Sequence, residues 1–184
     1  MNKIITLLCI ILFFGTELLH AQMNIEEMLK SSADSIKKNA IGKEFCNFEL
    51  ITLDKEFISS KDLIGKITLI DFWFGTCSPC IAEIGELIEL YCRLKDNEKF
   101  QFLSFTTDNP DISKRYVEEY NIPYIVCPIS REDAYRMNFG AGFPTKIILD
   151  KDGKTIFFHA GGFVDQKRIK QKLKEIEDMI KELL

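Results

Sequence analysis

Residues 71–80 decide the fold: they read Asp-Phe-Trp-Phe-Gly-Thr-Cys-Ser-Pro-Cys. The overlapping stretch 67–74 is apolar apart from one threonine and one aspartate, which is typical of a central β-strand covered on both faces. Two cysteines follow, Cys77 and Cys80, and the proline between them suits the first turn of a helix. The sequence therefore predicts a buried strand, a short loop and a helix whose N-terminus holds the first sulfur.

That position favours redox chemistry. The free N–H groups and the dipole of a helix N-terminus stabilise a thiolate, and they lower a cysteine pKa from about 8.5 to between about 3.5 and 7.5. We predict that Cys77 attacks disulfides and that Cys80, one turn further along, resolves the mixed disulfide. A zinc site would need four ligands, and the chain has neither a second C-x-x-C nor a nearby histidine pair. A purely structural disulfide is the other alternative.

Composition excludes several other classes of protein. The chain has 184 residues, of which 46% are hydrophobic and 28% are charged, as in a soluble globular domain. Lys plus Arg number 24 and Asp plus Glu 28, so the net charge of -4 gives no basic surface for nucleic acid. The only histidines are His20 and His159, which leaves little room for a histidine-rich metal site.

The first 21 residues are expected to be a secretory signal peptide. Lys3 provides a positive start, residues 4–14 form an apolar run interrupted by one threonine, and Ala21 offers a small residue for cleavage. The run is shorter than the roughly 20 apolar residues of a transmembrane helix. An uncleaved anchor, or a lipoprotein acylated at Cys9, are the alternatives.

Export changes how the remaining cysteines are interpreted, because thiols outside the cytosol can persist as disulfides. Five cysteines follow residue 21, so they cannot all pair within the chain. Cys92 lies four residues after Ile88 and is predicted to be a small buried side chain on the same apolar face. Cys46 and Cys127 lie on separate predicted strands, and whether they pair is left open.

Strands and helices alternate along the rest of the chain, which predicts an α/β sheet with helices on both faces. A short amphipathic helix is expected at 24–38, and a capped helical turn begins at 59–62. Strands are expected at 45–53, 67–74, 100–106, 124–126, 145–149 and 155–159, and helices after residue 80 and at 112–120, 131–137 and 169–180. The segment Asp-Lys-Asp-Gly at 150–153 predicts a hairpin between the last two strands.

Four features in this order resemble the thioredoxin superfamily, and within it the exported TlpA-like and ResA-like thiol:disulfide oxidoreductases. They are Ile-Gly-Lys-Glu-Phe at 41–45, the strand with its Cys-Ser-Pro-Cys motif, Gly-Phe-Pro-Thr at 142–145, and the turn at 150–153. The resemblance implies a thioredoxin-like fold over residues 41–184, after an N-terminal helical extension at 22–40. It also implies a mixed central sheet flanked by helices, an added N-terminal hairpin and a central helix–strand insertion.

The resemblance also implies roles for residues beside the sulfurs. Asp71 matches the buried aspartate behind the resolving cysteine of thioredoxins, and the alternative is a solvated aspartate at a strand edge. Glu83 matches the glutamate of ResA-like members, and the alternative is an ordinary first-turn glutamate favoured by the helix dipole.

Substrate binding is expected at three further residues. Pro144 matches the family's cis-proline, and the backbone of Phe143 is expected to pair with an extended client segment. Trp73, with its neighbour Phe74, is a candidate for lining the docking surface. The sequence departs from the family at Thr76, where a tryptophan often stands.

We therefore predict an exported thiol:disulfide oxidoreductase of the periplasm or cell envelope that reduces protein disulfides. It would need no cofactor beyond its own sulfurs, no stable metal, and an upstream membrane or periplasmic thiol donor. A thiol peroxidase of the peroxiredoxin type would carry P-x-x-x-T-x-x-C, but Ile70 and Phe74 occupy the first and second conserved positions. A Sco-like copper-delivery protein would carry C-x-x-x-C with a distal histidine, and the cysteine spacing here is one residue short.

Overall fold

The computed structural model of the protein describes residues 27–28 and 31–184. The chain divides into two compact units, with the boundary between Ile36 and Lys37. In the first unit, residues 27–28 and 31–36 are helical. The expected signal peptide at 1–21 lies outside the described residues. Within the described part of the chain, no helix has the length and apolar character needed to cross a membrane.

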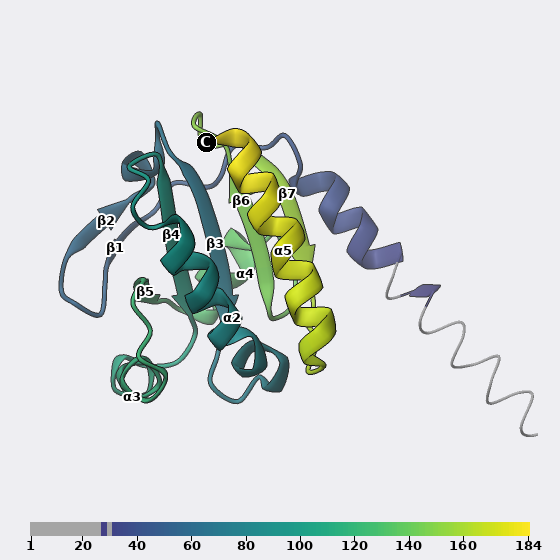
Figure 1. The fold of residues 1–184 in the computed structure, drawn as a ribbon. Helices are drawn as coiled ribbons and strands as arrows, with labels where there is room; N and C mark the ends of the chain where they lie inside the picture. Colours follow the sequence, from purple (N-terminus) through teal and green to yellow (C-terminus); the bar gives the residue numbers. More distant parts are fainter. Residues whose placement is uncertain (1–26, 29–30) are drawn as a thin grey trace, which may run out of the picture. The chain divides into compact units, whose positions relative to one another are not determined.

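The second unit is built on a mixed sheet of five strands in the order β5-β4-β3-β6-β7 (Figure 1). The strands are β3 (Ile67–Trp73), β4 (Phe100–Thr106), β5 (Ile125–Pro128), β6 (Thr145–Leu149) and β7 (Thr155–Ala160). β3, β4 and β5 are parallel to one another, whereas β6 and β7 run antiparallel to their neighbours. β3 is buried along its whole length, as its apolar sequence predicts.

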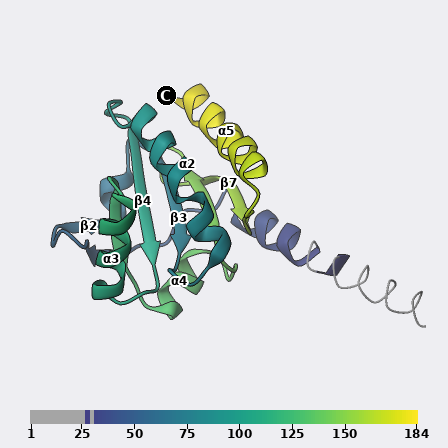
Figure 2. The ribbon, with the colours of Figure 1, turned by 60° about the horizontal axis from the view of Figure 1, so that its bottom comes forward.

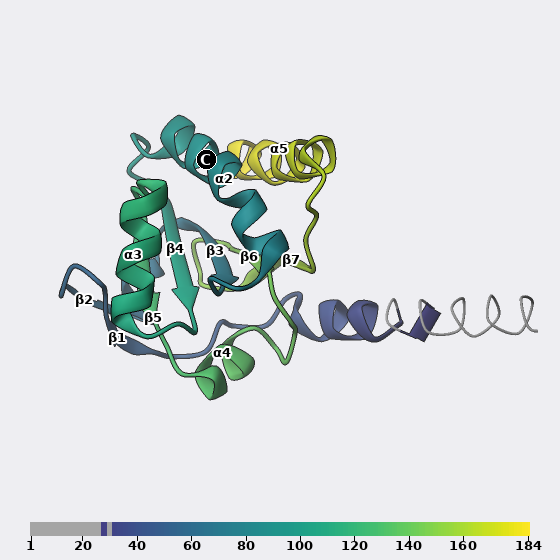
Figure 3. The same cartoon turned by 90° about the horizontal axis from the view of Figure 1, so that it is seen from below.

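Helices cover the two faces of the sheet. The face that carries Leu69 and Trp73 packs against α2 (Ser78–Leu94) and α5 (Gln166–Leu183), which lie together on one side in Figures 2 and 3. α3 (Pro110–Tyr120) adds its partly buried Tyr116 to the same core. α4 (Arg131–Met137) lies on the opposite side (Figure 3).

The two additions expected on the thioredoxin-like fold are both present. β1 (Glu49–Ile51) and β2 (Phe57–Ser59) form a separate antiparallel hairpin, followed by the short helix η1 (Ser60–Leu63) with its capping box. α3 and β5 form the helix–strand insertion between β4 and α4. The thioredoxin-like α/β fold predicted from the sequence is therefore confirmed.

The strand expected at 45–53 is much shorter than predicted. Phe45 and Phe48 are buried, but they precede β1 and pack edge-to-face as part of an aromatic cluster. The N–H of Phe45 donates to the carbonyl of Gly153, and the N–H of Thr155 donates to the carbonyl of Lys43, so this segment is held by the β6–β7 turn and the start of β7. Apolar residues in this segment therefore reflect burial against the domain and not a long hairpin.

Candidate active site

The disulfide lies at the N-terminus of α2. Cys77 caps the helix, Pro79 occupies its first turn, and the N–H of Cys80 donates to Cys77 Sγ at 3.3 Å. Cys77 and Cys80 are bonded to each other, with 6% and 3% of their surfaces exposed. The sequence order of strand, loop and helix therefore places the sulfur of Cys77 where a thiolate is stabilised.

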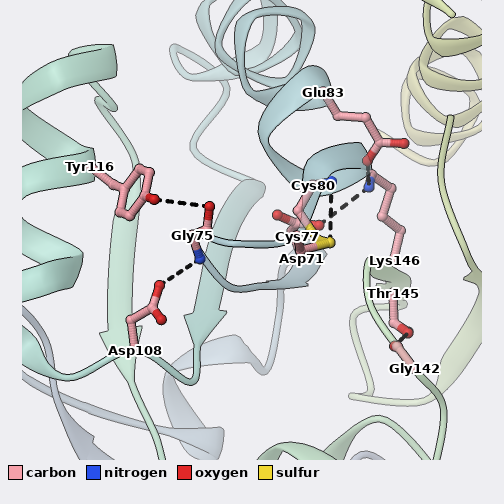
Figure 4. The surroundings of a disulfide bond; sticks show 10 residues. All are labelled: Asp71, Gly75, Cys77, Cys80, Glu83, Asp108, Tyr116, Gly142, Thr145 and Lys146. Carbon is pink, nitrogen blue, oxygen red and sulfur yellow. Dashed lines mark hydrogen bonds and ion pairs between the residues drawn. A yellow bond between two sulfur atoms is a disulfide. The ribbon is translucent and has the colours of Figure 1, made fainter. Parts of the chain in front are cut away.

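Three charged side chains are buried in the surroundings of the disulfide (Figure 4). Asp71 comes from β3, Glu83 from α2 and Lys146 from β6, and each is at most 4% exposed. Lys146 Nζ lies 3.3 Å from Asp71 Oδ1, and the same ammonium donates a hydrogen bond to Glu83. One cation thus binds two carboxylates that are far apart in the sequence.

Burial and charge act on these three groups in opposite directions. Burial raises the pKa of Asp71 and of Glu83, and the ammonium of Lys146 only partly offsets that rise. Burial alone would lower the pKa of Lys146, but the two carboxylates raise it above its ordinary value. Among the residues that the structure describes, Asp71 Oδ1 has no hydrogen-bond partner, so its interaction with the ammonium is an ion pair.

The structure rules out the alternative roles considered for Asp71 and Glu83, and it adds Lys146, which was not predicted from the sequence. Asp71 is in the middle of the sheet, so the strand-edge alternative is wrong. Glu83 is buried beyond the first turn of α2, so the first-turn alternative is also wrong. Lys146 was missed. The available signal was a lysine in an otherwise uncharged strand, two residues after Pro144.

The opposite side of the redox loop is held by the insertion. The N–H of Gly75 donates to Asp108 Oδ2 at 2.6 Å, and its carbonyl accepts from Tyr116 Oη at 2.9 Å (Figure 4). A Cβ on residue 75 would overlap the Tyr116 ring, so only glycine fits here. Tyr116 also meets Trp73 edge-to-face, at 5.8 Å between ring centroids. Sequence reasoning missed Tyr116 and Asp108, because nothing local connects them with Gly75.

The residues expected to bind substrate divide into two groups. The peptide bond between Phe143 and Pro144 is cis, as the resemblance implies. Phe143 is partly exposed and packs edge-to-face on Phe74, with ring centroids 5.2 Å apart. Trp73 is only 3% exposed, and its indole N–H donates to Ser104 Oγ at 2.7 Å. It therefore lies in the core beneath this surface, whereas Phe74 and Phe143 reach it.

The other cysteines do not join the site. Cys46 and Cys127 are free in the structure, so the pairing left open by the sequence is not formed. Burial raises the pKa of the Cys127 thiol to about 12.

Cys92 is exposed, so the prediction of a buried side chain is wrong. A step of four residues overshoots a helical turn of 3.6 residues by about 40°. That step carries Cys92 beyond Ile88, which is itself only partly buried, and away from the stripe formed by Leu87 and Leu94.

The Redoxin family matches residues 40–176, which is most of the chain. The chain belongs to the Redoxin family. Thiol-disulfide oxidoreductase ResA of Bacillus thuringiensis (strain Al Hakam) is 34% identical over 122 residues, covering 65% of this chain and 69% of that protein. ResA of Halalkalibacterium halodurans is 26% identical over 129 residues, covering 68% of this Redoxin chain and 71% of its relative.

A solved structure supports the same placement. The thioredoxin domain of a thiol-disulfide oxidoreductase from Bacteroides vulgatus is 26% identical, with a TM-score of 0.61. The match covers 74% of this chain and 97% of that domain. With its C-x-x-C pair at a helix N-terminus, this Redoxin protein is a TlpA/ResA-like thiol:disulfide oxidoreductase of the thioredoxin superfamily.

Proposed function

We propose that this protein reduces disulfide bonds in other proteins outside the cytosol, with Cys77 as nucleophile and Cys80 as resolving thiol. The observation that carries the direction is the pair of buried carboxylates, Asp71 and Glu83, beside the sulfurs. Lys146 balances only one of the two carboxyl groups, so the cluster can add negative charge but no net positive charge beside the sulfurs once both are ionised. Negative charge there disfavours the Cys77 thiolate and opposes the helix dipole. Strong oxidants gain their power from an unusually stable reduced form, so these carboxylates favour a reductant.

The exchange transfers two electrons from the dithiol to the client. The Cys77 thiolate attacks one sulfur of the client disulfide, forming a mixed disulfide and releasing the first client thiolate. Cys80 loses its proton and attacks Cys77 Sγ, which releases the second client thiolate and forms the Cys77–Cys80 disulfide. The Cys80 proton and one proton from solvent, which took up the proton that Cys77 lost on ionising, end on the two client thiolates, and an upstream thiol donor must then reduce the protein again.

Client docking is assigned to the surface at which Phe74 and Phe143 are partly exposed, next to Pro144, which is itself buried. Phe143 is expected to pair through its backbone with an extended client segment, in the manner of an added strand. Trp73, which was a candidate for this surface, is buried in the core and held there by its hydrogen bond to Ser104. Pro144→Ala should therefore weaken turnover of a protein disulfide more than it weakens the fold. Unchanged turnover by this variant would contradict the docking assignment.

The direction is tested by equilibrating the full chain with a glutathione redox buffer and measuring the Cys77/Cys80 potential. A value near or below about -230 mV supports a reductase, and one near about -120 mV would show an oxidant.

The roles of the two sulfurs are tested separately. Cys77→Ser should abolish turnover, whereas Cys80→Ser should trap mixed disulfides through Cys77. The matched control is Cys92→Ser, which changes an exposed thiol of the same helix. If limited alkylation of the reduced protein labels Cys80 before Cys77, the assignment is reversed.

The location is supported by the signal-peptide pattern at residues 1–21. Fractionation of cells that express the full chain, with and without those residues, tests it. Recovery of both forms in the cytosol would refute export.

A further inference from the structure

A polar row crosses the sheet beneath α2 and α5. Ser104 on β4, Asp71 on β3, Lys146 on β6 and His159 on β7 are successive register partners. Direct partners on neighbouring strands point to the same face of a sheet. Most residues two positions away on this face are apolar and pack in the core under the helices, namely Leu69, Trp73, Phe102, Ile148 and Phe157, so the row is a narrow polar line in the core.

Asp71 and Lys146 of this row, together with Glu83, which reaches Lys146 from α2, give one ammonium and two carboxyl groups. The other titratable groups that face it are uncharged: burial lowers the pKa of His159 to about 4 and holds the pKa of Tyr124 well above its ordinary value. From α5, Lys172 faces His159 but is paired with Glu175 at 2.6 Å. Asp71 and Glu83 therefore depend on Lys146 for neutralisation.

Full ionisation would leave a net negative charge in the core, and full protonation would leave an ammonium without a counter-ion. Both arrangements are costly for buried groups. A single proton on the carboxylate pair makes the cluster neutral. Glu83 has further support, because the backbone N–H of Phe163 favours its ionised form and Gly162 packs over its carboxylate.

We propose that Lys146 is a positioning residue for proton transfer at the disulfide: by binding Asp71 and Glu83 together, it makes them hold one exchangeable proton and keeps one carboxylate ionised to accept the proton of the Cys80 thiol. The inference rests on the proposed exchange reaction. When Cys80 attacks Cys77, its proton passes to the ionised carboxylate, and the pair later releases that proton to the departing client thiolate. In the reverse reaction the protonated carboxyl returns a proton to the Cys80 thiolate.

The first test is the pH profile of disulfide reduction by the full chain. Lys146→Met should move the acidic limb of the profile to higher pH by at least about one unit, a tenfold loss on the acidic side, with recovery at alkaline pH. Lys146→Arg keeps the charge and should restore most of the profile. Lys174→Met, which removes an exposed lysine paired with Asp178, should match the unaltered protein. An equal loss at every pH would overturn the inference.

The second test does not require activity. Infrared spectra of the oxidised protein should show one buried protonated carboxyl at neutral pH, and Lys146→Met should add a second. Lys146→Met combined with Glu83→Gln removes the cation and one carboxylate together, so it should fold and show one protonated carboxyl. If turnover is absent but the infrared pattern holds, the reductase assignment fails while the cluster stands. Identical spectra for Lys146→Met and the unaltered protein would refute the inference.

Discussion

The two sides of the redox disulfide are built in different ways. On one side, β3, α2 and β6 bring three buried charges together around Lys146. On the other, Asp108 and Tyr116 hold Gly75 through its N–H and its carbonyl. Charge in the core responds to pH, whereas hydrogen bonds to the Gly75 peptide chiefly fix its position. The charged side therefore controls proton transfer at the disulfide, whereas the Gly75 side controls the position of the redox loop.

The largest effect is expected on the geometric side. Gly75→Ala places a methyl group against the Tyr116 ring, so the loop before Cys77 must move, and a shift of about 1 Å can cost about 100-fold in rate. The measurement is turnover of a protein disulfide across pH, and the loss should be similar at every pH.

Two controls sharpen this prediction. Gly85→Ala lies on α2 with no atom near the added methyl, so activity should be retained. Gly75→Ala with Tyr116→Ala removes the overlap and should recover part of the rate. If Gly75→Ala alone turns over like the unaltered chain, the insertion does not position the loop.

A smaller and pH-dependent effect is expected on the charged side. The pKa of Asp71 is raised by folding, so the folded state retains a proton that the unfolded state loses above about pH 4. That contribution to stability is present at low pH and is lost as the pH rises. Asp71→Asn escapes this loss, so at pH well above 4 the oxidised variant should be more stable by about 1–3 kcal/mol. Urea unfolding at acidic and alkaline pH measures it, and a difference that does not grow with pH would contradict the charge argument.

The smallest effect is expected from Tyr116→Phe. This change keeps the ring against Gly75 and removes only the hydroxyl that donates to its carbonyl. Loss of one such bond costs about 1 kcal/mol, so thermal unfolding and turnover should change slightly and equally across pH. A loss of turnover that depends on pH in this variant would show that the Gly75 side also affects proton transfer, and would contradict the comparison.

The sequence predicted what depends on local pattern and missed what depends on distant pairing. β3, the start of α2 and the β6–β7 turn each have a continuous signature in a few neighbouring residues. The role of Lys146 depends on its register opposite Asp71, which lies about 75 positions earlier in the chain, so neighbouring residues do not predict it. Tyr116 likewise reaches Gly75 from the insertion. Cys92 shows a further limit, because helical spacing alone does not say where the edge of a buried stripe lies.

The pairing of Asp71 with Lys146 also bears on how the sheet is assembled. β6 joins the antiparallel β6–β7 ribbon to the parallel half, and it continues after Lys146 as Ile147, Ile148 and Leu149. Apolar side chains would be buried on either face, so they distinguish poorly between neighbouring registers. A slip of one residue would turn Lys146 to the opposite face, away from both carboxylates. Lys146 therefore helps to fix the register between β6 and β3, where the antiparallel and parallel halves of the sheet meet.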